Sequence, residues 1–222
     1  MAQKMTKKER REAAKAARIE AQKRAAKQRM LRRIYSMSAV VAVIALIVFF
    51  VVRSNQGSQA AREDLNALAA AASCDPLETP VQDGREHVAT PVQYESNPPT
   101  SGNHAGGTGP TGVIAAAVPA ENLVHNLEHG HVGLWYAPDA QEAVVTALNE
   151  VVNDDPTWRF SIQQEGMPTP IAFSAWGTLM RCDGTGAPED IAAAARAFVD
   201  VTGRNAPEDI PGTAASSAPI GG

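Results

Sequence analysis

Lysine is absent from the chain after residue 27, and cysteine occurs only twice among 222 residues. Residues 1–33 carry 13 lysines and arginines against three acids, a net charge of +10. The rest of the chain carries seven arginines against 21 acids, a net charge of −14. So strong an asymmetry indicates that the two parts occupy different surroundings. A basic tract of this kind could bind nucleic acid, but it holds no pattern that reads bases, so no nucleic-acid partner is expected.

Charged residues are also absent between Arg33 and Arg53, where the chain reads IYSMSAVVAVIALIVFFVV. As a helix, residues 34–52 would span roughly 30 Å, the thickness of the hydrocarbon core of a bilayer. A buried core helix is one alternative, and a cleavable signal peptide ending near Ser58-Gln59-Ala60 is another. The basic segment is long for a signal peptide, and the apolar run exceeds the usual length of about 7–15 residues. The sequence therefore predicts an uncleaved membrane anchor.

The basic residues before the anchor determine its predicted orientation. Because Lys and Arg that flank a span stay in the cytoplasm, residues 1–33 are expected inside and the chain after the span outside, in the cell envelope. Residues 1–33 also have strong helix propensity and almost no large apolar side chains, so they cannot bury a face in a core. Their simplest role is to enforce topology, and contact with anionic lipids of the inner leaflet is the alternative.

The two cysteines, Cys74 and Cys182, both fall in the part expected outside, and they form no CxxC motif. An even number of cysteines in an exported domain predicts one disulfide, with two buried free thiols as the alternative. Closing a loop of about 100 residues would stabilise the domain by about 4–5 kcal/mol in the chain-entropy model.

The composition divides the chain into five segments. They are a basic cytoplasmic helical segment (1–33), a transmembrane helix (34–52), a stalk (53–73), an extracytoplasmic globular domain (74–209) and a disordered tail (210–222). The stalk contains an Ala-rich stretch with helical composition. The tail consists of small residues with Pro and Gly and carries no charge.

Inside the globular domain, residues 75–118 hold most of the Pro and Gly and are expected to form loops. The remainder alternates between strand and helix patterns. Strands are predicted at 131–137, 158–164 and 170–182, and amphipathic helices at 138–154 and 188–203, the second ending at Gly203. This order predicts an α+β fold: a small mixed sheet with helices on one face, preceded by the basic helix and the transmembrane helix.

All five histidines lie in the outer domain, at positions 87, 104, 125, 129 and 131. Residues 119–130 have the pattern of a short helix with Gly130 at its C′ position. His125 and His129 then stand at i and i+4 on one face of that helix. Imidazole and carboxylate ligands suit Zn²⁺ or Cu²⁺. The sequence therefore predicts a metal site formed by His104, His125, Glu128 and His129.

Several alternatives stay open for this cluster. The imidazoles could hydrogen-bond to loop backbone in a structural role, or they could sense pH. Residues 125–129 also match H-x-x-E-H, the inverted zinc-protease motif, in which Glu128 would be the catalytic general base. The peptidase hypothesis is weakened because the helix is only about two turns long and no later helix clearly offers a third ligand. A Ser101–His–Glu128 nucleophile is weaker still, because Thr100-Ser101-Gly102 is not a nucleophile elbow.

Two strings carry a family resemblance, NPPTSGNH at 97–104 and HNLEHG at 125–130, with AWG later at 175–177. Through them the chain resembles the bacterial membrane-anchored family catalogued as domain-of-unknown-function family 3105, over roughly residues 74–209. The resemblance implies a basic start, one span and an outer domain, and it implies no activity. Besides the metal candidates, it marks a motif scaffold: Pro98, Pro99, Thr100, Ser101, Gly102, Asn126 and Gly130. His87 and His131 fall outside the two strings and rank lower.

Together these patterns predict a membrane-tethered extracytoplasmic domain whose His/Glu site binds a divalent metal or a small polar ligand. A metal-dependent hydrolase that uses the same residues is the first alternative, and a non-catalytic interaction module of the cell envelope is the second. A non-enzymatic role is favoured, and a divalent metal such as Zn or Cu is the one cofactor considered. The predicted partners are the lipid bilayer and, through residues 1–33, anionic lipids, whereas an envelope protein partner is left unidentified.

Overall fold

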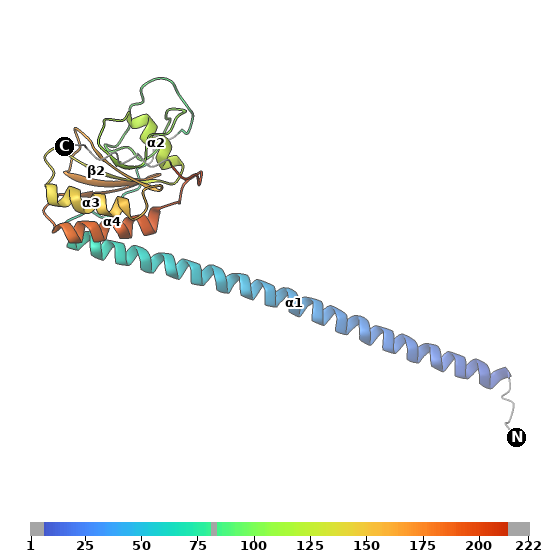
Figure 1. Ribbon diagram of the computed structural model, residues 1–222. Coiled ribbons are helices and arrows are strands. Elements are labelled where there is room, and N and C mark those ends of the chain that lie inside the picture. The colour runs from blue at the N-terminus through green and yellow to red at the C-terminus, as the bar shows by residue number, and fades with distance from the viewer. Residues whose placement is uncertain (1–6, 81–83, 213–222) are drawn as a thin grey trace. The chain divides into compact units, whose positions relative to one another are not determined.

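The computed structural model describes residues 7–80 and 84–212 (Figure 1). The chain divides into two compact units, Met1–Gly57 and Ser58–Gly222. Helix α1 (Lys7–Ala71) makes up the described part of the first unit and continues into the second. By length and composition, its segment Val43–Ala71 is apolar enough to cross a membrane. That segment begins within the predicted anchor, residues 34–52.

The second unit is built on a five-stranded mixed sheet with the strand order β1-β3-β2-β4-β5. Strands β1, β3 and β2 run parallel, whereas β4 is antiparallel to β2 and β5 is antiparallel to β4. The central strand β2 reads VGLWY and is almost wholly buried, as expected for a strand covered on both faces. A mixed sheet with helices confirms the predicted α+β class. The strands are β1 (Gly112–Ile114), β2 (Val132–Tyr136), β3 (Arg159–Gln163), β4 (Ile171–Ala175) and β5 (Thr178–Cys182).

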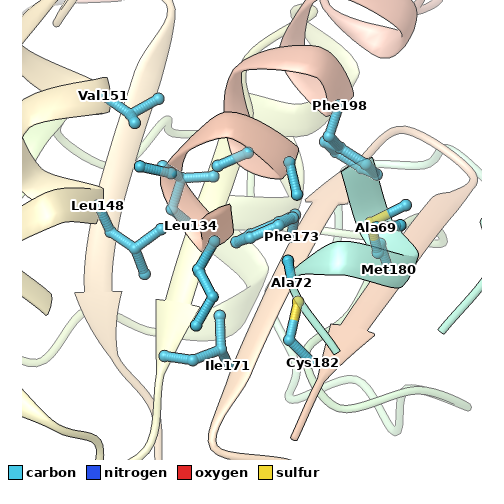
Figure 2. Packing of buried hydrophobic residues seen from close by; sticks show 14 of the residues in the cluster. Ala69, Ala72, Leu134, Leu148, Val151, Ile171, Phe173, Met180, Cys182 and Phe198 are labelled. Carbon is cyan, nitrogen blue, oxygen red and sulfur yellow. The ribbon is translucent and has the colours of Figure 1, made fainter. Parts of the chain in front are cut away.

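Helices α3 (Glu142–Asn153) and α4 (Pro188–Thr202) lie together on one face of the sheet, as predicted (Figure 1). Leu148 and Val151 of α3, one turn apart, point into the main hydrophobic core with Phe198 of α4 and Phe173 of β4 (Figure 2). α4 begins with a proline in its first turn and ends directly before Gly203, which confirms the predicted start and stop.

The opposite face of the sheet carries a second apolar cluster and helix α2 (Ala120–Glu128). Leu127 of α2 belongs to this cluster with Trp135 of β2 and Phe160 of β3, whose rings meet edge to face at 5.3 Å. Gly133 is required here, because a Cβ atom at that position would stand 2.6 Å from the Phe160 ring. Helices therefore cover both faces of the sheet. The sequence predicted helices on one face only, and α2 is the helix that lies on the other face.

The last turns of α1 belong to the globular core. Leu65, Ala69 and Ala72 are at most 1% exposed and pack in the main core with α4 and β5. Leu65 and Ala69 stand four residues apart on one face of the helix, and Ala72 follows directly after its end. The core therefore begins before Cys74, inside the segment predicted as a stalk at 53–73. Small alanine side chains allow this close approach of the helix, whereas the sequence pattern alone predicts a helical spacer.

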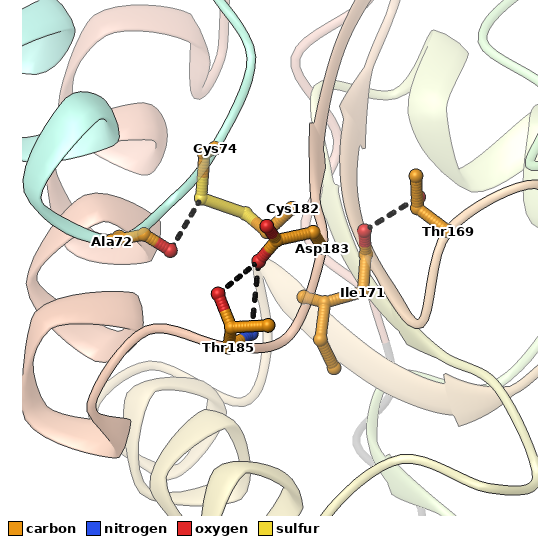
Figure 3. The surroundings of a disulfide bond; sticks show 7 residues. All are labelled: Ala72, Cys74, Thr169, Ile171, Cys182, Asp183 and Thr185. Carbon is orange, nitrogen blue, oxygen red and sulfur yellow. Dashed lines mark hydrogen bonds between the residues drawn. A yellow bond between two sulfur atoms is a disulfide. The ribbon is translucent and has the colours of Figure 1, made fainter.

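A disulfide joins Cys74 to Cys182, which confirms the predicted bond (Figure 3). It connects the residues after α1 to the end of β5. On the same side, Glu78 forms an isolated bridge with Leu179, and Arg181 donates hydrogen bonds to both carboxylate oxygens of Glu78. The chain from 74 to 78 thus lies along the outer edge of β5.

Four local predictions need correction. The helix predicted at 138–154 begins only at Glu142, because residues 138–140 form a turn. The long strand predicted at 170–182 is two strands, because Trp176 and Gly177, the latter at φ +66°, form a tight turn that pairs β4 with β5. The loop predicted at 75–118 contains the short strand β1 at its end. Residues 210–212, predicted as the start of a disordered tail, are bonded to the domain, because the Gly212 N–H donates to the Thr157 carbonyl at 2.9 Å. Residues 213–222 lie outside the described residues.

Candidate metal centre

The loop that reads NPPTSGNH holds His104 in the interior. Residues 98–102 of this loop are buried, and His104 is fully buried. The loop has a cis bond between Asn97 and Pro98, and Gly102 has a φ of +116°, a left-handed conformation that favours glycine. The Gly102 carbonyl accepts a hydrogen bond from His104 Nδ1 at 2.9 Å. The motif therefore fixes both the position and the ring orientation of His104.

A short parallel bridge brings His87 beside His104. The Val88 N–H donates to the His104 carbonyl at 2.8 Å, and the His104 N–H donates to the Glu86 carbonyl at 3.1 Å. The Glu86 N–H also donates to the Asn103 side chain at 3.0 Å. As a result, the ring centroids of His87 and His104 are 5.1 Å apart, although 17 residues separate them in the chain.

Helix α2 supplies the other half of the cluster. His125 and Glu128 stand one turn apart, and both are buried. Asn126 is also buried and donates to the Pro110 carbonyl at 3.1 Å, which ties the helix to the loop before β1. Gly130 follows the helix with a φ of +91°, so it is the C′ residue that the sequence predicted.

His87, His104, His125 and Glu128 each offer one ligand atom, and all of these atoms lie within 4.8 Å of one another. The His125 ring is 4.7 Å from that of His87 and 4.9 Å from that of His104. His104 Nε2 and Glu128 Oε2 are 3.0 Å apart. In a tetrahedral Zn²⁺ site with bonds of about 2.0–2.1 Å, neighbouring ligand atoms are about 3.3 Å apart. The four groups therefore need only small movements to enclose one ion.

The hydrogen bonds of two imidazoles select the tautomer that binds metals. His104 Nδ1 donates to the Gly102 carbonyl, and His125 Nδ1 donates to the Ala105 carbonyl at 2.8 Å. In a neutral ring the proton on Nδ1 leaves a lone pair on Nε2. The buried His104 Nε2 has no hydrogen-bond partner and faces a carboxylate oxygen. A proton or a cation must lie between two such acceptors, and backbone carbonyls that orient ligating imidazoles are typical of metal sites.

Electrostatics keep His125 in the neutral, ligating form. Burial lowers the pKa of His125 below its usual 6.5, and the hydrogen bond to the Ala105 carbonyl opposes this shift. The neighbouring imidazoles of His129, His104 and His87 lower it further. An imidazole that disfavours a proton in this way can still bind a metal ion through its lone pair.

The other two histidines lie outside this group of four. His129, which the sequence placed among the ligands, is the C-cap residue of α2, and its Nε2 lies 3.3 Å from Glu208 Oε2. Its ring still packs against His125, with centroids 4.5 Å apart. His131 donates through Nε2 to the Ile210 carbonyl at 3.0 Å. His129 thus stays beside His125, as i, i+4 spacing predicts, but its Nε2 lies against Glu208 rather than in the group of four.

The structure thus brings together three of the four predicted ligands, His104, His125 and Glu128, and adds His87 in place of His129. Sequence reasoning ranked His87 lower because it stands alone, outside both motif strings. The only sequence feature that could have indicated His87 is that, like the other four histidines, it lies in the outer domain. The AWG string also has a place here, since the Trp176 ring meets that of His104 at 6.1 Å and the Gly177 N–H donates to the Thr100 carbonyl.

Comparison with known proteins gives one match. The sequence model of a family described as "Protein of unknown function (DUF3105)" matches residues 87–214. The match begins at His87 and includes the whole group of four, together with the sheet and α4. Neither the curated proteins nor the solved structures contain a match.

Proposed function

The chain belongs to the DUF3105 family of proteins of unknown function, and from this premise we propose that its globular unit binds a divalent transition metal through His87, His104, His125 and Glu128. One observation carries the proposal. The buried lone pair of His104 Nε2 faces the Glu128 carboxylate at 3.0 Å, without another partner, inside a ring of imidazoles. A cation placed between them would satisfy all of these groups at once.

The ligand set favours Zn²⁺ or Cu²⁺. Three imidazole nitrogens and one carboxylate oxygen suit borderline metals such as zinc and copper, whereas Ca²⁺ and Mg²⁺ prefer sites made mostly of oxygen. Both cysteines are joined in the disulfide, so the described residues bring no thiolate to the cluster. A soft ion such as Cu(I) would therefore be held less well.

The second part of the proposal is that this site lies outside the cytoplasmic membrane, on a single-pass protein with a cytoplasmic N-terminus. The described side chains of residues 43–52 in α1 are apolar and exposed, with exposed fractions of 49–66% for the large ones. An all-round apolar helix surface is stable in lipid rather than in water. The disulfide supports an oxidising compartment for the globular unit. The basic residues 1–33 support the orientation.

Binding is preferred to hydrolysis because of how Glu128 and His129 are used. The H-x-x-E-H peptidase arrangement needs two histidine ligands from one helix and a glutamate free to act as a base. Here His129 is paired with Glu208, and Glu128 is turned toward His104 and belongs to the ligand group. The geometry therefore supports a glutamate ligand better than a glutamate base.

Isothermal titration of the full-length chain in detergent with Zn²⁺ and Cu²⁺ tests the metal site. We expect one bound ion per chain at neutral pH, with weaker binding at pH 5 because protons compete for the imidazoles. His87→Ala removes an exposed ligand with little effect on the core, so it should lower the affinity at least about tenfold. His129→Ala makes the same chemical change outside the group and should cost less. Equal affinities for wild type and His87→Ala, or no binding by wild type, would reject the site.

A further inference from the structure

Arg85 lies at the rim of the proposed metal site. Its guanidinium Nη1 is 4.0 Å from Glu128 Oε1, the oxygen that does not face His104. The Arg85 side chain is 58% exposed, whereas that of Glu128 is only 5% exposed. The guanidinium therefore stands between the buried carboxylate and solvent, on the side where the exposed His87 also lies.

The backbone around Arg85 explains its direction. Both backbone groups of Glu86 are hydrogen-bonded: its N–H donates to the Asn103 side chain, and its carbonyl accepts from the His104 N–H. In an extended segment, residues two apart point to the same side. Arg85 and His87 both reach the cluster, so they follow this alternation. Held in this way, the segment directs both the Arg85 guanidinium and the His87 imidazole toward the proposed metal site.

Metal binding would change the role of Arg85. In the absence of an ion, the negative charge of Glu128 attracts the guanidinium. A divalent cation bound to Glu128 and three neutral imidazoles has a net charge of +1, and Arg85 adds another. The rim of the loaded site is then positive and open to solvent. A guanidinium is well suited to bind carboxylate or phosphate oxygens through paired N–H donors.

We propose that the metal-loaded site binds a small oxyanion, a carboxylate or phosphate group, with one oxygen on the metal and another on the Arg85 guanidinium. This inference rests on the proposed metal site and adds the class of its ligand. Zn²⁺ and related ions can expand from four to five ligands, so an added oxygen does not require loss of a protein ligand. The anion would approach from the His87 and Arg85 side.

The test uses the full-length chain in detergent, loaded with Co²⁺, whose visible absorption reports changes in its ligands. Acetate and inorganic phosphate are titrated separately at constant ionic strength. We expect a saturable spectral change with at least one of them, and the tighter of the two identifies the group that is recognised. Arg85→Gln should bind that anion at least about tenfold more weakly, because a charge-assisted hydrogen bond is lost. Arg62→Gln, the same change on an exposed arginine of α1, serves as the control.

Three outcomes separate the two proposals. No Co²⁺ spectrum with wild type would reject the metal site, and the anion site with it. A normal Co²⁺ spectrum that neither anion alters would reject the anion site alone. So would an anion response of equal affinity in wild type and Arg85→Gln. Arg85→Gln should bind Co²⁺ at least as tightly as wild type, because the guanidinium repels the ion.

Discussion

The histidines of the globular unit differ in which ring nitrogen is bonded to the backbone. His104 and His125 use Nδ1, which leaves Nε2 pointing toward the proposed site. His131 uses Nε2, which leaves a buried Nδ1 without a hydrogen-bond partner in the interior. The same type of side chain therefore supplies the proposed metal ligands in one place and a structural anchor in the other. The choice follows from the position of a single carbonyl group near each ring.

His131 should make stability depend on pH. Burial lowers its pKa from 6.5 to about 4, and the hydrogen bond to Ile210 only partly opposes this shift. Between pH 6.5 and about 4 the unfolded chain is protonated at this residue and the folded chain is not. The free energy of unfolding should therefore fall as pH drops through this window, by up to about 3 kcal/mol. Urea denaturation at pH 7, 5.5 and 4 in the presence of a chelator measures it.

His131→Gln is the matched variant, because its amide can still donate to Ile210 but does not titrate. It should be less stable than wild type at pH 7 and lose less stability on acidification. His125, whose pKa is also lowered, acts in the same direction and remains in both proteins. Parallel pH profiles for the two proteins would contradict the assignment to His131.

At the scale of elements, the segment after α4 secures the end of α2. The N–H groups of Arg204, Glu208 and Ile210 donate to the carbonyls of Gly130, Glu128 and His129, at 3.0–3.2 Å. Terminal carbonyls of a helix lack partners within the helix, so these bonds complete it. Because α2 carries His125 and Glu128, the segment 204–210 helps to hold two of the proposed ligands in place through bonds to the helix backbone.

Glu208→Pro should loosen this support. Proline removes the N–H that bonds the Glu128 carbonyl, which should lower the free energy of unfolding by about 1–3 kcal/mol and also weaken Zn²⁺ binding. Glu208→Gln keeps the N–H and removes only the charge near His129. Because the Glu208 side chain is half-exposed, its pairing with His129 should contribute less than about 1 kcal/mol to the free energy of unfolding. Chemical denaturation and zinc titration of both variants compare the two effects. If Glu208→Gln costs as much as Glu208→Pro, the side chain rather than the backbone bond is responsible.

Elements with strong local patterns could be predicted from sequence, and those defined by distant contacts could not. β2, α3, β3 and α4 followed from periodicity, proline and glycine. β1 has three residues and exists because β3 lies beside it. The turn at Trp176 and Gly177 interrupts an apolar run that reads as continuous, and only strand pairing reveals it.

The same distinction applies to the site. His104, His125 and Glu128 were predicted because two motifs and a helix repeat point to them. His87 could not be predicted, since the bridge that joins residue 87 to 104 leaves no mark on the residues between. The i, i+4 spacing correctly predicts that His129 lies beside His125, but it does not predict the carboxylate of Glu208, which His129 Nε2 contacts instead. Its motif position is explained instead by its contacts with Glu208 and the His125 ring.

At the scale of the whole molecule, the distribution of lysine offers a direct test of topology. All lysines lie within residues 1–33. An amine-reactive reagent that cannot cross membranes should therefore leave the protein unlabelled on intact cells and label it after permeabilisation, if the N-terminus is cytoplasmic. Arg196→Lys adds a lysine at a half-exposed position of α4 and should give labelling on intact cells. Labelling of the unaltered protein on intact cells would reverse the proposed orientation.

The disulfide between Cys74 and Cys182 has a consequence for how the protein tolerates proteolysis. All four members of the proposed metal site lie between the two cysteines, within one covalent loop. A protease that cuts an exposed stretch of this loop, such as residues 106–108, would leave both pieces joined through the disulfide. The nicked chain would run as one species on a gel until a reductant is added. The ligands on both sides of the cut would stay on the same molecule, so a single nick need not empty the site.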